Sequence, residues 1–232
     1  MDSFRRALNA PITSRLRVAV FASGRGSNFQ AIIEAQRSGE LAIDVVVLCS
    51  DKPASRAVAT ATQDGIPSVA LDAKKYTHRA EFDYALFDRA AEFQPDLIVL
   101  AGFMRVIDEA IVERWRGRMI NIHPSLLPKY PGLRTHQRAL DGRDRVHGAS
   151  VHFVTPELDG GPVIAQTELT IGEHDDAAKL ASRLLPLEHR LLIASIRLIA
   201  TQRVRLDASS VLFDGRPLSH PLKMREDDEL HM

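Results

Sequence analysis

Short apolar runs alternate with segments of helical periodicity along the first half of the chain. The runs are rich in β-branched residues, which predicts strands over 17–22, 43–49, 66–70, 96–101 and 119–123. Apolar residues at helical spacing lie between these runs and predict helices over 28–39, 54–64, 77–93 and 108–116. This alternation predicts an α/β fold with a doubly wound, mostly parallel sheet.

The pattern changes in the second half of the chain. A short helical segment over 135–140 precedes an alternating run over 149–154 and a strand-like run over 162–171. A loop with two glycines joins these runs, which favours a hairpin or an antiparallel edge on the sheet. A longer helical pattern over 175–201 contains Pro186, which predicts a kink or a break, and a brief strand over 211–213 follows.

No linker-like stretch, internal repeat or low-complexity segment divides the sequence. We therefore predict a single domain over 15–216, whose C-terminal part is an antiparallel extension of the sheet. The two ends, 1–14 and 217–232, are predicted to be flexible tails.

Composition excludes several classes of protein. Lys plus Arg and Asp plus Glu both number 30 in 232 residues, so there is no global basic field of the kind that nucleic-acid binding uses. Cys49 is the only cysteine, which excludes a disulfide within the chain and a cysteine zinc site, and suits a reducing cytoplasm. No apolar run approaches the ~18 residues of a membrane span, and the N-terminus does not resemble a signal peptide. We expect neither a metal site nor a membrane association.

The segment 119–133 carries the strongest chemical signal. Asn121 and His123 are two apart on a predicted strand, so their side chains project from the same face where the strand ends. Three prolines follow and stiffen the turn. A hydrogen-bond donor and an acid/base group on a rigid support, at a strand end where α/β sheets bind ligands, favour chemistry on a carbonyl. The alternative is a buried strand end with a satisfied polar pair.

A glycine turn over 23–28 follows the first predicted strand and opens the first predicted helix. Glycines and free backbone N–H groups at a helix start favour a bound anion, and a phosphate fits best. The turn lacks the Lys-Ser/Thr of a P-loop, and Phe29 occupies the third glycine position of the dinucleotide fingerprint. A small phosphorylated metabolite is therefore favoured over a nucleoside triphosphate or NAD. A purely structural turn or cap is the alternative.

The loop 155–162 places Asp159 beside two glycines and a proline. One interpretation is a plain Asp-Gly turn. The other is that Asp159 reaches His123 across the sheet end, raises the pKa of the imidazole and keeps a proton available near neutral pH. Spacing alone does not show that the two residues meet.

Three motifs together resemble the phosphoribosylglycinamide formyltransferase family. They are Asn-Ile-His-Pro-Ser-Leu-Leu-Pro at 121–128, Gly-Arg-Gly-Ser-Asn at 24–28 and Ala-Gly-Phe-Met-Arg at 101–105, and the resemblance covers about 17–213. It implies a Rossmann-like formyltransferase fold. It also implies transfer of the formyl group of 10-formyltetrahydrofolate, a co-substrate, to the amine of 5'-phosphoribosylglycinamide in purine biosynthesis, without a metal.

The resemblance also implies roles for particular residues. Asn121, His123 and Asp159 match the catalytic positions. The ribonucleotide positions are Gly26, Ser27, Asn28, Gly102 and Glu188, and the folate positions are Arg79, Met104, Arg105, Val106, Ile107 and Asn121. Departures from the family pattern occur at Arg25, Arg134 and Pro186.

Three other functions remain as alternatives. Hydrolysis of 10-formyltetrahydrofolate needs no phosphate site, so the glycine turn argues against it. Methionyl-tRNA formyltransferase would need a further C-terminal domain and a basic surface. A phosphate-metabolite sensor without catalysis would not need Asn121, His123 and Asp159 together. We expect small-molecule substrates, no nucleic acid and no membrane, with a homodimer as a possibility.

Overall fold

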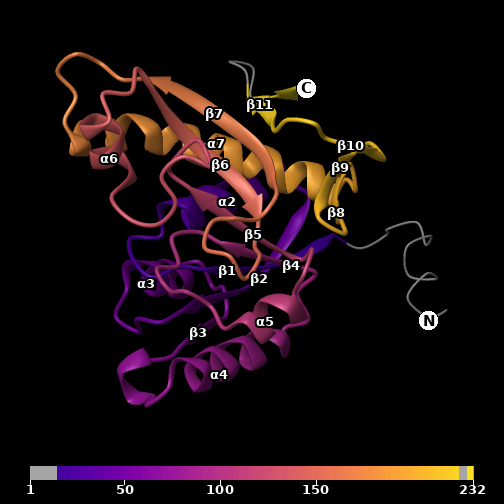
Figure 1. Cartoon of the computed structure of the whole chain (residues 1–232). Helices are drawn as coiled ribbons and strands as arrows, with labels where there is room; N and C mark the ends of the chain where they lie inside the picture. Colours follow the sequence, from indigo (N-terminus) through magenta and orange to yellow (C-terminus); the bar gives the residue numbers. More distant parts are fainter. Residues whose placement is uncertain (1–14, 225–228, 232) are drawn as a thin grey trace.

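The computed structural model describes residues 15–224 and 229–231, and one sheet organises that part of the chain (Figure 1). Within these residues nine strands pair in the order β12-β11-β7-β6-β5-β4-β1-β2-β3. The parallel half contains β1 (Leu16–Phe21), β2 (Ile43–Ser50), β3 (Ser68–Ala70), β4 (Leu97–Leu100) and β5 (Met119–His123). The predicted α/β fold with a doubly wound, mostly parallel sheet is confirmed.

Helices cover both faces of this sheet (Figure 1). They are α2 (Ser27–Ser38), α3 (Arg56–Gln63), α4 (Arg79–Ala91), α5 (Glu109–Arg114), α6 (Thr135–Asp141) and α7 (Ala177–Ala200), with a 3-10 turn η1 (Ala73–Lys75) before α4. Alternate residues of β1 enter opposite cores: Val18 and Val20 pack with α2, α3 and α7, whereas Ala19 and Phe21 pack with α4 and α5. Burial on both faces explains why the parallel strands are continuously apolar.

The antiparallel part of the sheet is built by β6 (Val146–Phe153) and β7 (Val163–Thr170), which pair with each other, while β6 also pairs antiparallel with β5. The predicted hairpin is thus confirmed. Of the kink or break predicted at Pro186, the break is wrong, because α7 runs through the proline as one helix, and the kink stays a prediction. Leu184 and Leu191, on either side of the proline, are fully buried, so packing holds both halves of the helix despite one lost hydrogen bond.

The C-terminal region departs most from expectation. Strands β8 (Val204–Asp207), β9 (Ser210–Phe213) and β10 (Arg216–Pro217) form a small antiparallel sheet. The predicted tail is wrong over its described part, because β11 (Leu222–Met224) pairs in parallel with β7 and β12 (Leu230–His231) pairs with β11. Leu222 is fully buried, and this apolar contact fixes the strand.

Two other predictions, the tail at 1–14 and the limits of the domain, are not tested by the structure. The predicted tail 1–14 lies outside the described residues, and the limits of the predicted domain stay a prediction. In the ranges that the structure describes, no helix is both long and apolar enough to cross a membrane.

Candidate active site

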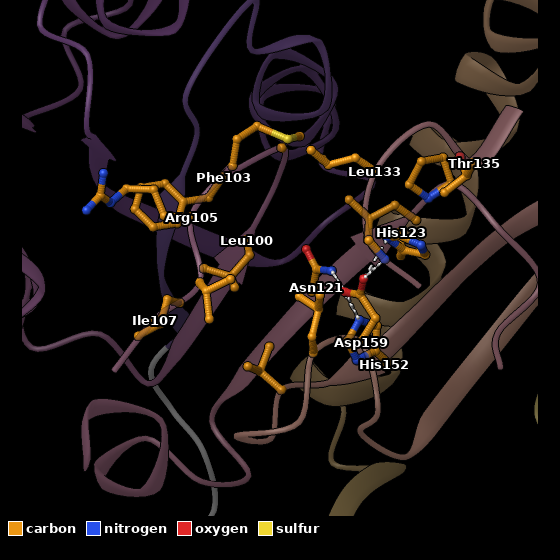
Figure 2. Close-up of a pocket in the computed structure, with 18 of the residues that line it drawn as sticks. Leu100, Phe103, Arg105, Ile107, Asn121, His123, Leu133, Thr135, His152 and Asp159 are labelled. Atoms are coloured by element: carbon orange, nitrogen blue, oxygen red, sulfur yellow. Dashed lines mark hydrogen bonds and ion pairs between the residues drawn. The ribbon is translucent and has the colours of Figure 1, made fainter. Parts of the chain in front are cut away.

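A cavity of about 540 Å³ opens beyond the carboxyl ends of β4 and β5 (Figure 2). Its wall is largely apolar and includes Leu100, Phe103, Val112, Leu133 and Leu158. Four of its polar side chains converge from β5, β6 and the loop after β6, and they are Asn121, His123, His152 and Asp159. A mostly apolar cleft with a few convergent polar groups at the ends of parallel strands is a typical ligand site in an α/β fold.

Asp159 is the hub of these polar groups. One carboxylate oxygen, Oδ2, lies 3.4 Å from Nδ1 of His123 and accepts a hydrogen bond from the backbone N–H of Gly132 at 2.8 Å. The other, Oδ1, lies 3.4 Å from Nδ2 of Asn121. Figure 2 shows the carboxylate between His123 and His152. The predicted meeting of Asp159 with His123 is therefore confirmed as geometry.

The effect of this contact on His123 differs from expectation. Burial is the largest influence and lowers the pKa of the imidazole below its ordinary value. The hydrogen bond to the carbonyl of Tyr130 and the charge of Asp159 act in the opposite direction but do not outweigh burial. The expectation that Asp159 gives His123 a raised pKa is therefore wrong, although its own contribution has the expected sign. Asp159 itself has a lowered pKa: burial raises it, but the contacts with His152, Gly132 and His123 together outweigh burial.

The glycine turn lies next to this cavity. Gly26 adopts φ 73° and ψ 27° at the N-terminus of α2, a left-handed conformation that glycine tolerates best. Ser23, the first residue of the glycine turn, connects the turn to the cavity wall. Its N–H donates a hydrogen bond to the carbonyl of Gly102, and its hydroxyl accepts one from the N–H of Met104. These hydrogen bonds fix the glycine turn, and with it the start of α2, relative to the cavity wall.

A buried acid lies beside the glycine turn. Glu188 on α7 is only 9% exposed, and burial raises its pKa to about 7, while a hydrogen bond from Asn28 acts in the opposite direction. Asn28 on α2 is also buried, and its Oδ1 has no hydrogen-bond partner. A polar pair of this kind, with spare hydrogen-bonding capacity, suits a hydroxyl-bearing ligand.

The chain matches the model of the family described as Formyl transferase over residues 16–196. It belongs to the formyl transferase family. A phosphoribosylglycinamide formyltransferase of Escherichia coli is 40% identical over 203 residues, which cover 88% of this chain and 96% of that protein. The structure of the phosphoribosylglycinamide formyltransferase of Coxiella burnetii in complex with CHES is 40% identical, with a TM-score of 0.84, and the match covers 89% of this chain and 97% of that one.

A solved structure with a different named activity is also similar. The formyltetrahydrofolate deformylase of Pseudomonas putida is 26% identical, with a TM-score of 0.77, and the match covers 88% of this chain and 72% of that one. Solved structures that resemble this chain in fold therefore include both a formyltransferase and a deformylase.

The remaining residues expected at the site fall into three groups in this formyl transferase. Gly102, Met104, Arg105, Val106 and Ile107 line the cavity, and Met104 is 65% exposed at its mouth. Arg79, by contrast, is exposed at the start of α4 and does not line the cavity. Gly26, Ser27, Asn28 and Glu188 lie at or beside the N-terminus of α2 and do not line the cavity. Arg105 lies across the cavity from His123 (Figure 2), with its guanidinium 4.3 Å from the ring centre of Phe82.

His152 is a polar member of the cavity that sequence reasoning missed. It lies opposite Asn121 where β5 and β6 pair, and its Nε2 is 3.1 Å from Nδ2 of Asn121. Its Nδ1 is 2.9 Å from the backbone carbonyl of Phe153, an acceptor, so Nδ1 carries the hydrogen and Nε2 accepts from Asn121. The alternating run 149–154 was the available signal, but it does not specify the strand partner.

Proposed function

We propose that this formyl transferase carries the formyl group of 10-formyltetrahydrofolate to the amine of 5'-phosphoribosylglycinamide in de novo purine biosynthesis. The observation that carries the proposal is the convergence of Asn121, His123 and Asp159 in an apolar cavity that adjoins a glycine turn. The names of the similar Escherichia coli and Coxiella burnetii proteins support the same activity.

The two halves of the site match the two substrates. The largely apolar cavity, with Met104 to Ile107 along one side, suits the flat rings of a folate. The free N–H groups at the start of α2 suit the phosphate of the ribonucleotide. Glu188 and Asn28 next to this turn supply hydrogen-bonding groups for the ribose hydroxyls. Arg79 is proposed to contact the distal, charged end of the folate, outside the cavity itself.

The reaction follows from this arrangement. The neutral amine of the ribonucleotide attacks the formyl carbon, and the carbonyl oxygen becomes an oxyanion. The bond from that carbon to N10 of the folate then breaks. The nucleophile loses one proton and N10 gains one, so the transfer balances without a metal or a covalent enzyme intermediate. Holding both substrates in line supplies a large share of the rate enhancement.

Each polar residue has a distinct role in this proposal. Asn121 donates an N–H to the oxyanion, a contribution worth about 100- to 1,000-fold in comparable sites. Both hydrogens of its amide face protein acceptors, Nε2 of His152 at 3.1 Å and Oδ1 of Asp159 at 3.4 Å, and the substrate oxygen would replace Asp159 in the longer of these two contacts. His123 exchanges the proton, worth roughly 100- to 10,000-fold. Asp159 favours the charged imidazole and orders the groups around it.

Hydrolysis of the same folate is the second candidate, because the similar Pseudomonas putida protein is a deformylase. Water would replace the amine, and the glycine turn with Glu188 would then have no ligand. This favours the transferase.

We further propose a cytoplasmic location, in line with the biosynthetic enzymes that the chain resembles, and a homodimer, which light scattering would test.

A folate assay tests the proposal directly. Release of tetrahydrofolate from the formyl donor is followed by absorbance, with and without the ribonucleotide. Release that depends on the ribonucleotide and yields its N-formyl product is expected. Equal release without the ribonucleotide would instead establish a hydrolase. Binding of both ligands with no release in either case would establish a sensor.

A further inference from the structure

Tyr130 lies in the turn that follows β5 and presents its backbone carbonyl to His123. The carbonyl oxygen is 2.9 Å from Nε2 of the imidazole. A carbonyl only accepts hydrogen bonds, so Nε2 carries the hydrogen. The other ring nitrogen, Nδ1, faces Oδ2 of Asp159 at 3.4 Å. It follows that Nδ1 is the atom at which His123 gains and loses its proton.

The backbone of Tyr130 has a conformation that needs outside support. Its φ is 56°, in the left-handed region that a bulky residue rarely adopts. Such a conformation persists only where the surrounding structure holds it. The carbonyl that meets His123 therefore depends on what restrains the rest of this residue.

The restraint comes from the side chain of Tyr130 itself. Its hydroxyl donates a hydrogen bond to Oδ2 of Asp144 at 3.0 Å, and Nζ of Lys129 lies 3.0 Å from Oδ1 of the same carboxylate. Gly142 lies against the hydroxyl so closely that an added Cβ would be 2.6 Å from it. Asp144 and Gly142 thus form a close-fitting seat for the hydroxyl, and neither residue lines the candidate catalytic cavity.

We propose that Tyr130 is a positioning residue for formyl transfer: the seat at Asp144 and Gly142 holds its carbonyl on Nε2 of His123, so that proton exchange takes place at Nδ1 beside Asp159. The inference rests on the proposed function of His123. The inference goes beyond that function in two ways. It identifies Nδ1 as the atom of His123 that exchanges the proton, and it identifies Tyr130, Asp144 and Gly142 as the groups that determine this choice of atom.

The surroundings of His123 determine the direction of the expected effects. Burial disfavours the charged imidazole most, and the charges of His152 and Arg138 act in the same direction. His136 and His147 also interact with His123 unfavourably when charged. The Tyr130 carbonyl and Asp159 favour the charged imidazole. Loosening the carbonyl removes one of the two favourable influences. The limb of the pH–rate profile that reports His123 should therefore move to lower pH, and the ring should gain access to its other tautomer.

The principal test is Tyr130→Phe, which deletes only the hydroxyl. Tyr84→Phe is the matched control, because Tyr84 is 41% exposed on α4 and distant in sequence from the site. We expect a kcat about 5- to 30-fold lower in Tyr130→Phe, with both KM values within about twofold of the wild type, because the reacting groups lose alignment rather than binding contacts. The ¹⁵N spectrum of the imidazoles, with the His123 signal assigned by its loss in His123→Gln, should show a mixture of tautomers in place of Nε2–H alone.

Gly142→Ala is a second test, which displaces the hydroxyl of Tyr130 instead of deleting it. Gly142 has φ −73°, so alanine fits the backbone there, but its Cβ must displace the hydroxyl of Tyr130. The same loss of kcat and the same spectral change are expected. Wild-type kcat in Tyr130→Phe, or an Nε2–H signal that is unchanged in both variants, would overturn the proposal. The spectra report the tautomer whether or not the wild type uses the ribonucleotide, so failure of the proposed function is separately visible in the folate assay.

Discussion

Gly26 and Ala57 approach each other so closely that a Cβ on Gly26 would lie 2.7 Å from the Cβ of Ala57. This contact joins the start of α2 to the first turn of α3, and the carbonyl of Gly24 accepts a hydrogen bond from the N–H of Ala57 beside it. The free N–H groups at the start of α2 are therefore fixed by the packing of a second helix. A phosphate site here depends on the absence of a side chain at residue 26.

Replacement of that glycine should impair binding of the phosphorylated substrate selectively. In Gly26→Ala the new Cβ meets Ala57, and the left-handed φ is unfavourable for alanine, which together cost about 2–4 kcal/mol. We expect the KM for the ribonucleotide to rise at least tenfold and the KM for the folate to change by less than threefold. Gly24→Ala is the control, because nothing lies within 4 Å of its added Cβ. Equal changes in both KM values would contradict the assignment.

Removal of the imidazole should affect turnover more than binding. His123→Ala is expected to lower kcat by roughly 100- to 10,000-fold, while folate binding measured by calorimetry stays within a few-fold. His220→Ala is a suitable control, because His220 is exposed and its Nδ1 lies 3.2 Å from the hydroxyl of its neighbour Ser219. Wild-type turnover in His123→Ala would remove this residue from the mechanism.

The carboxylate next to this imidazole gives a prediction with a definite sign. The charge of Asp159 favours protonated His123, so Asp159→Asn should lower the pKa of His123 further below its ordinary value. The pH at which turnover depends on His123 should fall with it. An NMR titration of the His123 ring measures the shift in each protein. A pKa that is equal in variant and wild type would show that the charge of Asp159 does not contribute to it.

Sequence reasoning went furthest where the chemistry is local. The spacing of Asn121 and His123 was sufficient to place both side chains in one cavity, because strand geometry fixes the faces of residues two apart. The glycine turn and the helix after it were predicted from the same local rules. The loop 155–162 gave Asp159 as a partner of His123 in only one of two interpretations, because 36 residues separate them, and the resemblance to a family favoured that one.

Other features depended on contacts that no local pattern encodes. His152 reaches Asn121 only through the antiparallel register of β5 and β6. The lowered pKa of His123 reflects the depth of burial, which a sequence does not give. The C-terminal residues looked like a charged tail, yet three of them complete the sheet beside β7, because one buried leucine is enough to anchor a short strand.

The buried acid near the glycine turn gives a prediction about stability. Burial raises the pKa of Glu188 from 4.5 to about 7 in the folded protein. The folded chain therefore holds a proton that the unfolded chain has lost between these pH values, and stability falls as the pH rises through this window. Glu188→Gln has no charge to lose, so the wild type should lose on the order of 3 kcal/mol relative to it between pH 4.5 and pH 7.

Urea unfolding at pH 5 and pH 8 measures this difference. The free energy of unfolding of Glu188→Gln should equal that of the wild type at pH 5 within about 1 kcal/mol, and exceed it at pH 8. Glu173→Gln controls for the loss of an exposed carboxylate, and it should follow the wild type at both pH values. If the free energy of unfolding of the wild type did not fall relative to that of Glu188→Gln between pH 5 and pH 8, Glu188 would already be ionised below neutrality. The ribose hydroxyls would then meet a carboxylate at every pH at which the enzyme is assayed, rather than a group that ionises within that range.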